Sequence, residues 1–249
     1  MRSDITPLIL TYNEEPNIER TLQRLHWAKQ IIVIDSFSTD KTLEILSLDH
    51  RVKVYQRRFD NFANQCNFGL TKIHSEWVLS LDADYVLSEP LVNELQSLEF
   101  SSTIDAYAVS FAYCVFGKPL SATLLPPRKV LYRKEKAIYQ EDGHAHQVSI
   151  EGGNISVLKN KIWHDDRKSL SRWIVSQDKY MIIEAKKIGE TPINELSFPD
   201  KIRQKKIIAP FIVFFYCLFI KRKQITQRWS RGVRIFPMFF CFCEKCKGN

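Results

Sequence analysis

The first hundred residues alternate between short apolar runs and longer segments with helical spacing. The apolar runs predict strands at residues 5–12, 30–35, 52–56 and 77–81, and the intervening segments predict helices at 17–25, 41–48 and 62–73. Pro16 is placed to open the first helix, and Thr39 or Asp40 to cap the second. Residues 31–34 are apolar at successive positions, which is typical of a strand buried on both faces of a parallel sheet. This order favours an open α/β sheet with helices on both faces.

The pattern changes after residue 105. Short β-like pieces at 106–116 and 130–139 are broken by Pro126-Pro127 and Gly152-Gly153, which predicts antiparallel strands mixed with long loops. Residues 169–188 then have the spacing of an amphipathic helix, with Trp173, Tyr180 and Ile183 near one face.

An apolar run at residues 207–220 lies between two groups of cations. A helix that spans a bilayer needs about 20 apolar residues, so this run is too short to cross comfortably. Lysines and arginines precede it at 201–206 and follow it at 221–223. Cations on both sides favour a helix that lies in the plane of an anionic membrane surface. Residues 201–223 would make this membrane contact. The alternative is a helix that docks on the core and has a solvated basic rim.

The basic charge of the chain belongs to its tail. The formal net charge is +8, yet residues 201–249 contain 12 Lys and Arg against one acid, Glu244, so the body is close to neutral. The apolar run interrupts these basic residues and no reading helix is evident, so we expect no nucleic-acid partner. The N-terminus has no apolar export segment, which predicts a cytoplasmic chain with reduced thiols. Cys243 and Cys246 have C-x-x-C spacing but lack the four ligands of a structural zinc site.

Acidic side chains follow two of the predicted strands. Asp35 ends the second strand, and Asp82-Ala83-Asp84 follows the fourth. Ligands of open α/β sheets bind beyond the carboxyl ends of the strands. In extended backbone, Asp82 and Asp84 would project to the same side, where a cation would relieve their repulsion. Mg²⁺ and Mn²⁺ accept one or two carboxylates together with diphosphate oxygens, which a nucleotide-sugar supplies. The alternative is a polar loop after a strand.

Three motifs carry a resemblance to a known family. They are Ile-Leu-Thr-Tyr-Asn-Glu-Glu at 9–15, Val-Ile-Asp-Ser-Phe-Ser-Thr-Asp-Lys-Thr at 33–42 and Leu-Asp-Ala-Asp at 81–84. In this order and spacing they resemble the signatures of family 2 glycosyltransferases. The segments 141–146 and 162–165, followed by a helix, resemble the branch that includes lipopolysaccharide core glucosyltransferases.

The resemblance implies an α/β fold of GT-A type, a Rossmann-like open mixed sheet with helices on both faces. We expect this domain at 1–200, with a nucleotide-sugar half at 1–100 and an acceptor half at 101–200. The basic, apolar helical segment described above would then form a membrane-associating tail at 201–249. The implied activity is an inverting, metal-dependent transfer from a nucleotide-sugar to a glycan or glycolipid acceptor. The implied process is assembly of lipopolysaccharide or another surface glycan, by a protein peripheral on the inner face of the cell membrane.

The resemblance also assigns the nucleotide-sugar site. Thr11, Asn13 and Glu14 would line the nucleotide pocket, and Asp35 would hold the nucleobase. Asp82 would reach the ribose or the metal, and Asp84 the metal. Asn67 is a further candidate that would face the nucleotide from a helix, although a surface asparagine explains it nearly as well.

The base that accepts the acceptor proton is a separate prediction. Asp142 is the first candidate, and His144 and His146 are alternatives, each explained also as a loop histidine that orders the acceptor pocket. Relatives in this branch read Val-His-Glu where this chain has Ala145-His146-Gln147, which puts an acid-base role for the third position in doubt. His164 is interpreted as a structural residue rather than a catalytic one.

Two other function classes compete with this interpretation. A nucleotidyltransferase of similar fold would also use carboxylates and magnesium, but such enzymes open with a glycine-rich phosphate loop, and residues 7–13 contain no glycine. A non-catalytic nucleotide-binding membrane adaptor would tolerate the loss of Asp84 or Asp142, and the sequence has both.

Overall fold

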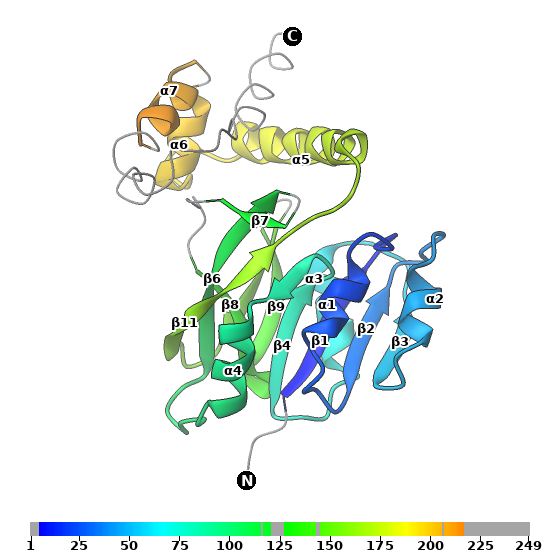
Figure 1. The fold of residues 1–249 in the computed structure, drawn as a ribbon. Helices are drawn as coiled ribbons and strands as arrows, with labels where there is room; N and C mark the ends of the chain where they lie inside the picture. The colour runs from blue at the N-terminus through cyan, green and yellow to red at the C-terminus, as the bar shows by residue number, and fades with distance from the viewer. Residues whose placement is uncertain (1–4, 116, 121–126, 143–144, 206, 217–249) are drawn as a thin grey trace, which may run out of the picture. The chain divides into compact units, whose positions relative to one another are not determined.

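The computed structural model describes residues 5–115, 117–120, 127–142, 145–205 and 207–216 (Figure 1). The chain forms two compact units, Met1–Ser169 and Leu170–Asn249. The division into domains at residue 200 stays a prediction.

The first half of unit 1 has the predicted β-α-β order. Its strands are β1 (Ile5–Thr11), β2 (Ile31–Asp35), β3 (Val52–Gln56) and β4 (Trp77–Asp82), and its helices are α1 (Ile18–Gln23), α2 (Thr42–Ser47) and α3 (Phe62–Leu70). All five residues of β2 are buried, as expected for a central parallel strand. Helix α3 ends at Leu70, three residues before the predicted end.

The second half of unit 1 is richer in strands than predicted. It contains β5 (Tyr85–Leu87), α4 (Glu89–Ser97), β6 (Ala106–Val115), β7 (Lys118–Pro119), β8 (Arg128–Arg133), a 3₁₀ turn (Lys134–Lys136), β9 (Ala137–Asp142), β10 (Ala145–Ile150) and β11 (Ile155–His164). The prediction of a single β-like piece at 130–139 is wrong. The segment divides into β8 and β9 because the two strands join different sheets.

The main sheet is mixed and open. Its strand order is β3-β2-β1-β4-β8-β6-β11-β5, with β7 paired to β6, and β9 and β10 form a separate two-stranded sheet. Strands β1 to β4 are parallel, whereas β8 runs antiparallel to both β4 and β6. The predicted α/β class with an open mixed sheet is confirmed.

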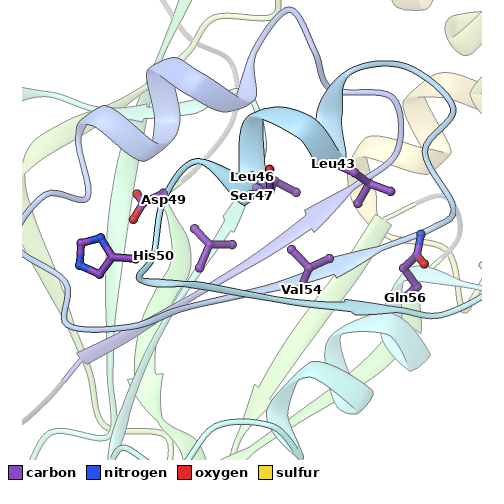
Figure 2. A pocket seen from close by; sticks show the side chains of 8 residues that line it. Leu43, Leu46, Ser47, Asp49, His50, Val54 and Gln56 are labelled. Atoms are coloured by element: carbon purple, nitrogen blue, oxygen red, sulfur yellow. The ribbon is translucent and has the colours of Figure 1, made fainter.

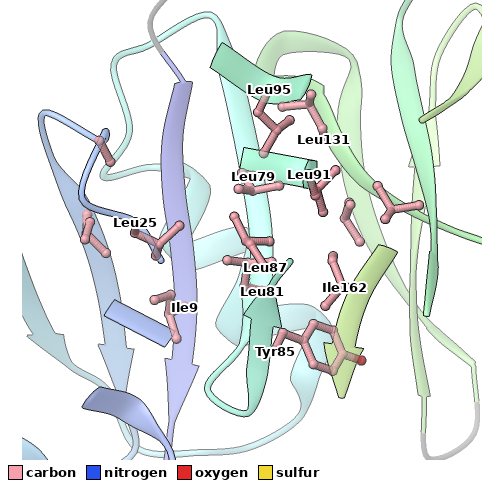
Figure 3. Packing of buried hydrophobic residues seen from close by; sticks show 14 of the residues in the cluster. Ile9, Leu25, Leu79, Leu81, Tyr85, Leu87, Leu91, Leu95, Leu131 and Ile162 are labelled. Carbon is pink, nitrogen blue, oxygen red and sulfur yellow. The ribbon is translucent and has the colours of Figure 1, made fainter. Parts of the chain in front are cut away.

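Two apolar clusters cover the two faces of this sheet. One joins Ile9 and Leu79 of the sheet to residues of α1 and α4 (Figure 3), and the other joins Leu8 and Ile34 to α3. Removing a leucine or isoleucine side chain from water stabilises the fold by about 1.5–3 kcal/mol. Helix α3 approaches the sheet closely at Gly69, where an added Cβ would lie 2.5 Å from a methyl carbon of Leu8.

Unit 2 is helical in its described part. It contains α5 (Leu170–Glu190), α6 (Phe198–Gln204) and α7 (Ile208–Phe215), of which α5 matches the helix predicted at 169–188. Arg203 of α6 pairs with Glu184 of α5 at 3.5 Å. No helix within the described residues of either unit is long and apolar enough to cross a membrane. Residues 217–249 of the tail, with Cys243 and Cys246, lie outside the described residues.

Candidate active site

The strand register brings the predicted site residues to one edge of the sheet. Thr11 at the end of β1 is opposite Asp35 at the end of β2, and Leu10 is opposite Asp82 at the end of β4. The carboxyl ends of these parallel strands therefore form the edge at which ligands of open α/β sheets bind.

Asp35 is fully buried and its carboxylate is saturated with hydrogen bonds. Its Oδ1 accepts from Thr11 Oγ1 at 2.9 Å and from Ser38 Oγ at 2.5 Å, and its Oδ2 accepts from the Ser38 backbone N–H at 2.9 Å. Asp35 thus ties the end of β1 to the loop after β2. The contact of Asp35 with the nucleobase of the donor stays a prediction.

Asn13 joins the same two loops from the other side. Its backbone has φ 55°, in the left-handed region that asparagine adopts more readily than most residues. Its N–H donates to Ser38 Oγ at 2.8 Å, and its side-chain oxygen accepts from the N–H of Thr39 at 2.7 Å and of Asp40 at 3.3 Å. The loop that holds Thr11, Asn13 and Glu14 is therefore held firmly against residues 36–40.

Glu14 lies among charged and polar side chains. Its Oε1 is 2.6 Å from Lys168 Nζ, and its Oε2 accepts from Asn17 Nδ2 at 2.9 Å. Burial raises the pKa of Glu14, the charge of Asp84 adds to that rise, and Lys168 and Asn17 oppose it. Glu14 and Asp84 therefore influence each other although they come from different loops.

The Asp82-Ala83-Asp84 segment has a different backbone from the one expected. Asp82 ends β4, and Ala83 and Asp84 form the turn into β5, so the expectation of extended backbone through Asp84 is wrong. The turn is held from two sides, because the Ala83 carbonyl accepts from Thr21 Oγ1 at 2.7 Å and the Asp84 carbonyl from the Asp165 N–H at 3.1 Å. Both carboxylates act on the same neighbour, since the charges of Asp82 and Asp84 each raise the pKa of Tyr85.

His164 contacts the predicted metal-binding carboxylate. It is the last residue of β11 and is opposite Tyr85 of β5, and its Nε2 lies 3.1 Å from Asp84 Oδ2. Burial lowers the pKa of His164, but the hydrogen bond and charge of Asp84 outweigh burial and raise the pKa overall. The interpretation of His164 as structural rather than catalytic does not identify Asp84 as its partner, because the pairing of β11 with β5 leaves no local signal in the sequence.

Tyr85 and Arg128 support Asp82, and sequence reasoning missed both. The Tyr85 hydroxyl accepts from Arg128 Nη1 at 3.1 Å, and the charge of Asp82 raises the pKa of both side chains. Burial raises the pKa of Tyr85 first of all, and the charge of Asp82 raises it further. Arg128 precedes the β-like piece predicted at 130–139 by two residues, and an arginine at such a place is common in any sheet.

The donor set at this edge fits a hard divalent cation that is also held by a ligand. Asp82 and Asp84 supply carboxylate oxygens, and His164 adds a nitrogen beside Asp84. Across the described residues, no group of three or more His, Cys, Asp and Glu side chains is arranged to hold a metal by itself. Mg²⁺ and Mn²⁺ commonly bind through one or two carboxylates plus substrate phosphates, so this edge suits a metal that arrives with a diphosphate.

The predicted base lies on the β9-β10 hairpin. Asp142 ends β9 opposite Ala145 of β10, and His146 is opposite Glu141. Asn67 of α3 holds this hairpin, since its amide accepts from the Tyr139 N–H at 2.9 Å and donates to the Tyr139 carbonyl at 3.0 Å. His144 lies outside the described residues. The nucleotide contact of Asn67 and the role of Asp142 stay predictions.

A separate open hollow lies between α2 and β3 (Figure 2). It is lined by Leu43, Leu46, Ser47, Asp49, His50, Val52, Val54 and Gln56. None of the predicted site residues lines it, and no lysine or arginine among its lining residues offers a nucleotide diphosphate a permanent positive charge. We therefore place the active site at the strand ends.

Comparison with known proteins identifies relatives over most of the chain. The model of glycosyl transferase family 2 matches residues 8–151, more than half of the chain. An uncharacterized glycosyltransferase of Rickettsia felis is 31% identical over 239 residues, covering 88% of this chain and 80% of the relative. One of Rickettsia bellii is 35% identical over 104 residues, and the match spans only 35% of that relative. The lipopolysaccharide core biosynthesis glycosyltransferase LpsC of Rhizobium meliloti is 22% identical, covering 73% of this chain and 70% of LpsC.

Solved structures share the fold. S. aureus TarS 1–349 in complex with UDP-GlcNAc has a TM-score of 0.53 at 19% identity, covering 93% of this chain and 76% of TarS. The mannosyltransferase PcManGT of Pyrobaculum calidifontis in complex with GDP-Man and Mn²⁺ has a TM-score of 0.52 at 15% identity, covering 91% and 73% of the two chains. These similarities show the same α/β architecture.

Proposed function

The chain belongs to glycosyltransferase family 2, and we propose that it transfers a sugar from a nucleotide-sugar donor to a hydroxyl of a glycan or glycolipid acceptor. The observation that carries the proposal is the contact of Asp84 with His164 at the carboxyl edge of the sheet, where Thr11 ends β1 and where the charge of Asp84 acts on Glu14. The UDP-GlcNAc bound by TarS and the GDP-Man bound by PcManGT support a nucleotide-sugar donor.

We propose an inverting reaction by a single displacement. The acceptor oxygen forms a bond to the anomeric carbon while the bond from that carbon to the diphosphate oxygen breaks. The diphosphate leaves with the electron pair, and the acceptor proton passes to a protein base. Asp142 is the proposed base, with His146 and His144 as alternatives.

Asp82 and Asp84 would hold a divalent cation, Mg²⁺ or Mn²⁺, with His164 as an adjacent nitrogen donor. When bound, such an ion supplies positive charge to the departing diphosphate. The Mn²⁺ in the PcManGT complex supports this assignment. The chain's own contribution is to fix the two carboxylates, through Thr21 on the Ala83 carbonyl and Asp165 on the Asp84 carbonyl.

The proposed acceptor belongs to a bacterial surface glycan such as lipopolysaccharide. The relationship to LpsC supports this acceptor class. We further propose that the protein is cytoplasmic and peripheral on the inner face of the cell membrane, bound through residues 201–223. Large exposed apolar side chains on α7, among them Phe211 and Phe214, support that placement.

The test is nucleotide-sugar turnover with and without metal. We expect the protein to release a nucleoside diphosphate from a suitable donor only with Mg²⁺ or Mn²⁺, and Asp84→Asn to lose at least about 99% of the rate because one metal ligand is gone. Asp49→Asn, which alters a carboxylate paired with Arg51 at the separate hollow, should keep the rate. Full activity in excess chelator would refute metal dependence. Release of inorganic pyrophosphate from a nucleoside triphosphate would instead favour a nucleotidyltransferase.

A further inference from the structure

Lys168 is a half-buried cation beside the candidate active site that the proposed reaction does not yet use. Its Nζ lies 2.6 Å from Glu14 Oε1 and 3.7 Å from Asp166 Oδ1, and its side chain is only 16% exposed. Removing an ammonium group from water is costly, so a lysine that is mostly removed from water needs compensating charges or a function. Here the compensating groups belong to the edge at which the donor is proposed to bind.

The surrounding network fixes Lys168 relative to Asp84. Asn17 is fully buried, and its Nδ2 donates to Glu14 Oε2 and to Asp166 Oδ1, each at 2.9 Å. The next segment in this network is 164–168, which contacts Asp84 twice, through the Asp165 N–H at 3.1 Å and through His164. The charges of Asp84 and Lys168 accordingly act on each other. Lys168 therefore has a defined position beside the carboxylate that would hold the metal.

The charge balance at this edge disfavours an anionic ligand. Four carboxylates at this edge interact electrostatically with His164 or Lys168. They are those of Glu14, Asp82, Asp84 and Asp166. A diphosphate brings further negative charge, and a divalent cation offsets only part of the total. A lysine held at the same edge would offset one more negative charge without a proton transfer.

We propose that Lys168 is a donor-binding residue whose ammonium group attracts the diphosphate of the nucleotide-sugar. This inference rests on the proposed function, since it concerns the same donor. A purely structural Lys168 would only neutralise Glu14 and hold segment 164–168 in place. The two roles predict opposite changes in metal affinity when Lys168 is replaced. Loss of the positive charge should strengthen binding of a metal cation and weaken binding of an anionic nucleotide. Loss of structure would weaken both.

The experiment measures the two affinities separately. Free Mn²⁺ is followed by electron paramagnetic resonance, and UDP and GDP binding by calorimetry at saturating Mn²⁺. Lys168→Gln keeps a hydrogen-bond donor for Glu14 without the charge, and we expect it to weaken nucleotide binding roughly tenfold. Its Mn²⁺ affinity should be equal or higher, and Lys168→Arg should restore nucleotide affinity to within about threefold. Lys168→Met should show the same pattern as Lys168→Gln.

Lys136→Met is the matched control. Lys136 makes a similar 2.6 Å ion pair with buried Asp105, near the start of β4 and thus at the opposite end of that strand from Asp82. We expect it to lower the melting temperature without changing either affinity. Equal weakening of Mn²⁺ and nucleotide in Lys168→Gln, or unchanged nucleotide affinity, would overturn the role of Lys168. A wild-type protein that binds neither UDP nor GDP with Mn²⁺ would overturn the proposed function itself.

Discussion

The Nε2 of His164 lies 3.1 Å from the Oδ2 of Asp84, although 80 positions separate the two residues. The antiparallel pairing of β11 with β5 produces this contact, because it sets His164 opposite Tyr85, the neighbour of Asp84. The rings of Tyr85 and Tyr113 pack on His164, with centroids 5.1 and 4.8 Å from its own, so the imidazole has little freedom to turn away.

We therefore expect His164→Ala to weaken Mn²⁺ binding. Residues that ligate a metal or orient its ligands typically contribute 10- to 100-fold in affinity, and we expect a loss of about that size. Titration of Mn²⁺ by electron paramagnetic resonance measures it. His26→Ala, at an exposed histidine after α1, should leave the affinity unchanged. Wild-type Mn²⁺ affinity in His164→Ala would show that the imidazole neither binds nor orients the metal site.

Local sequence pattern was sufficient for β1 to β4, because each strand is an apolar run of ordinary length between helical segments. It was insufficient for β8 and β9, which look continuous until their pairing with different sheets is known. Helix α4 was overlooked although its signals are present. Ser88 caps it by accepting from the Leu91 N–H at 3.4 Å, and a proline stands in its first turn.

The site shows the same division between local and long-range information. Asp35 and Asp82 could be placed because a strand end is visible in sequence and parallel strands end at one edge. The partners of Asp84 and Glu14 could not be placed, since His164 and Lys168 are about 80 and 150 residues away along the chain and reach the site only through the order of the sheet. Long-range pairing of this kind leaves no periodic trace.

Asp165 makes the stability of unit 1 sensitive to acid. Its buried carboxylate accepts from Arg20 Nη1 at 2.8 Å, from Arg167 Nε at 2.9 Å and from the Gly117 N–H at 3.0 Å. Burial alone would raise the pKa of Asp165, but the hydrogen bonds and charges of Arg167, Gly117 and Arg20 outweigh it and lower the pKa below 3.8. A lowered pKa in the folded state stabilises the fold above the unfolded value of 3.8, and this contribution is lost as pH falls through the folded value.

Asp165→Asn should therefore destabilise the protein at pH 7 by about 2 kcal/mol, the usual size for hydrogen bonds to a charged group. The difference from wild type should shrink as the pH falls below 3.8. Urea unfolding at several pH values measures both. Glu99→Gln, at an exposed carboxylate, should have little effect at any pH. A difference that does not change with pH would mean that the ionised carboxylate of Asp165 is not what stabilises the fold.

The identity of the base can be settled by two substitutions on the β9-β10 hairpin. A sugar hydroxyl is too weakly acidic to attack unaided at neutral pH, so it needs a base within hydrogen-bond reach. If Asp142 is that base, Asp142→Asn should lower kcat by about 10² to 10⁴ with donor affinity nearly unchanged. His146→Ala should then keep most of the rate. The reverse pattern would assign the base to His146, whose ordinary pKa is nearer neutrality.

The exposed face of α7 provides the test of membrane association. Phe211 and Phe214 are 61% and 50% exposed, and exposed cations stand just before this helix at Lys201 and Lys205. An apolar helix face with adjacent cations binds anionic bilayers through both hydrophobic burial and charge.

We expect the protein to sediment with vesicles that contain phosphatidylglycerol, to bind phosphatidylcholine vesicles less, and to be partly released at high salt. Replacing both Phe211 and Phe214 by serine should lower the bound fraction at every salt concentration, because the apolar contribution does not depend on screening. Leu48→Ser, which removes an 82% exposed leucine from unit 1, should bind like wild type. If the double variant and wild type sediment equally, α7 is not the membrane contact. If binding is equal on neutral and anionic vesicles, the flanking cations do not contribute, because their attraction requires anionic headgroups.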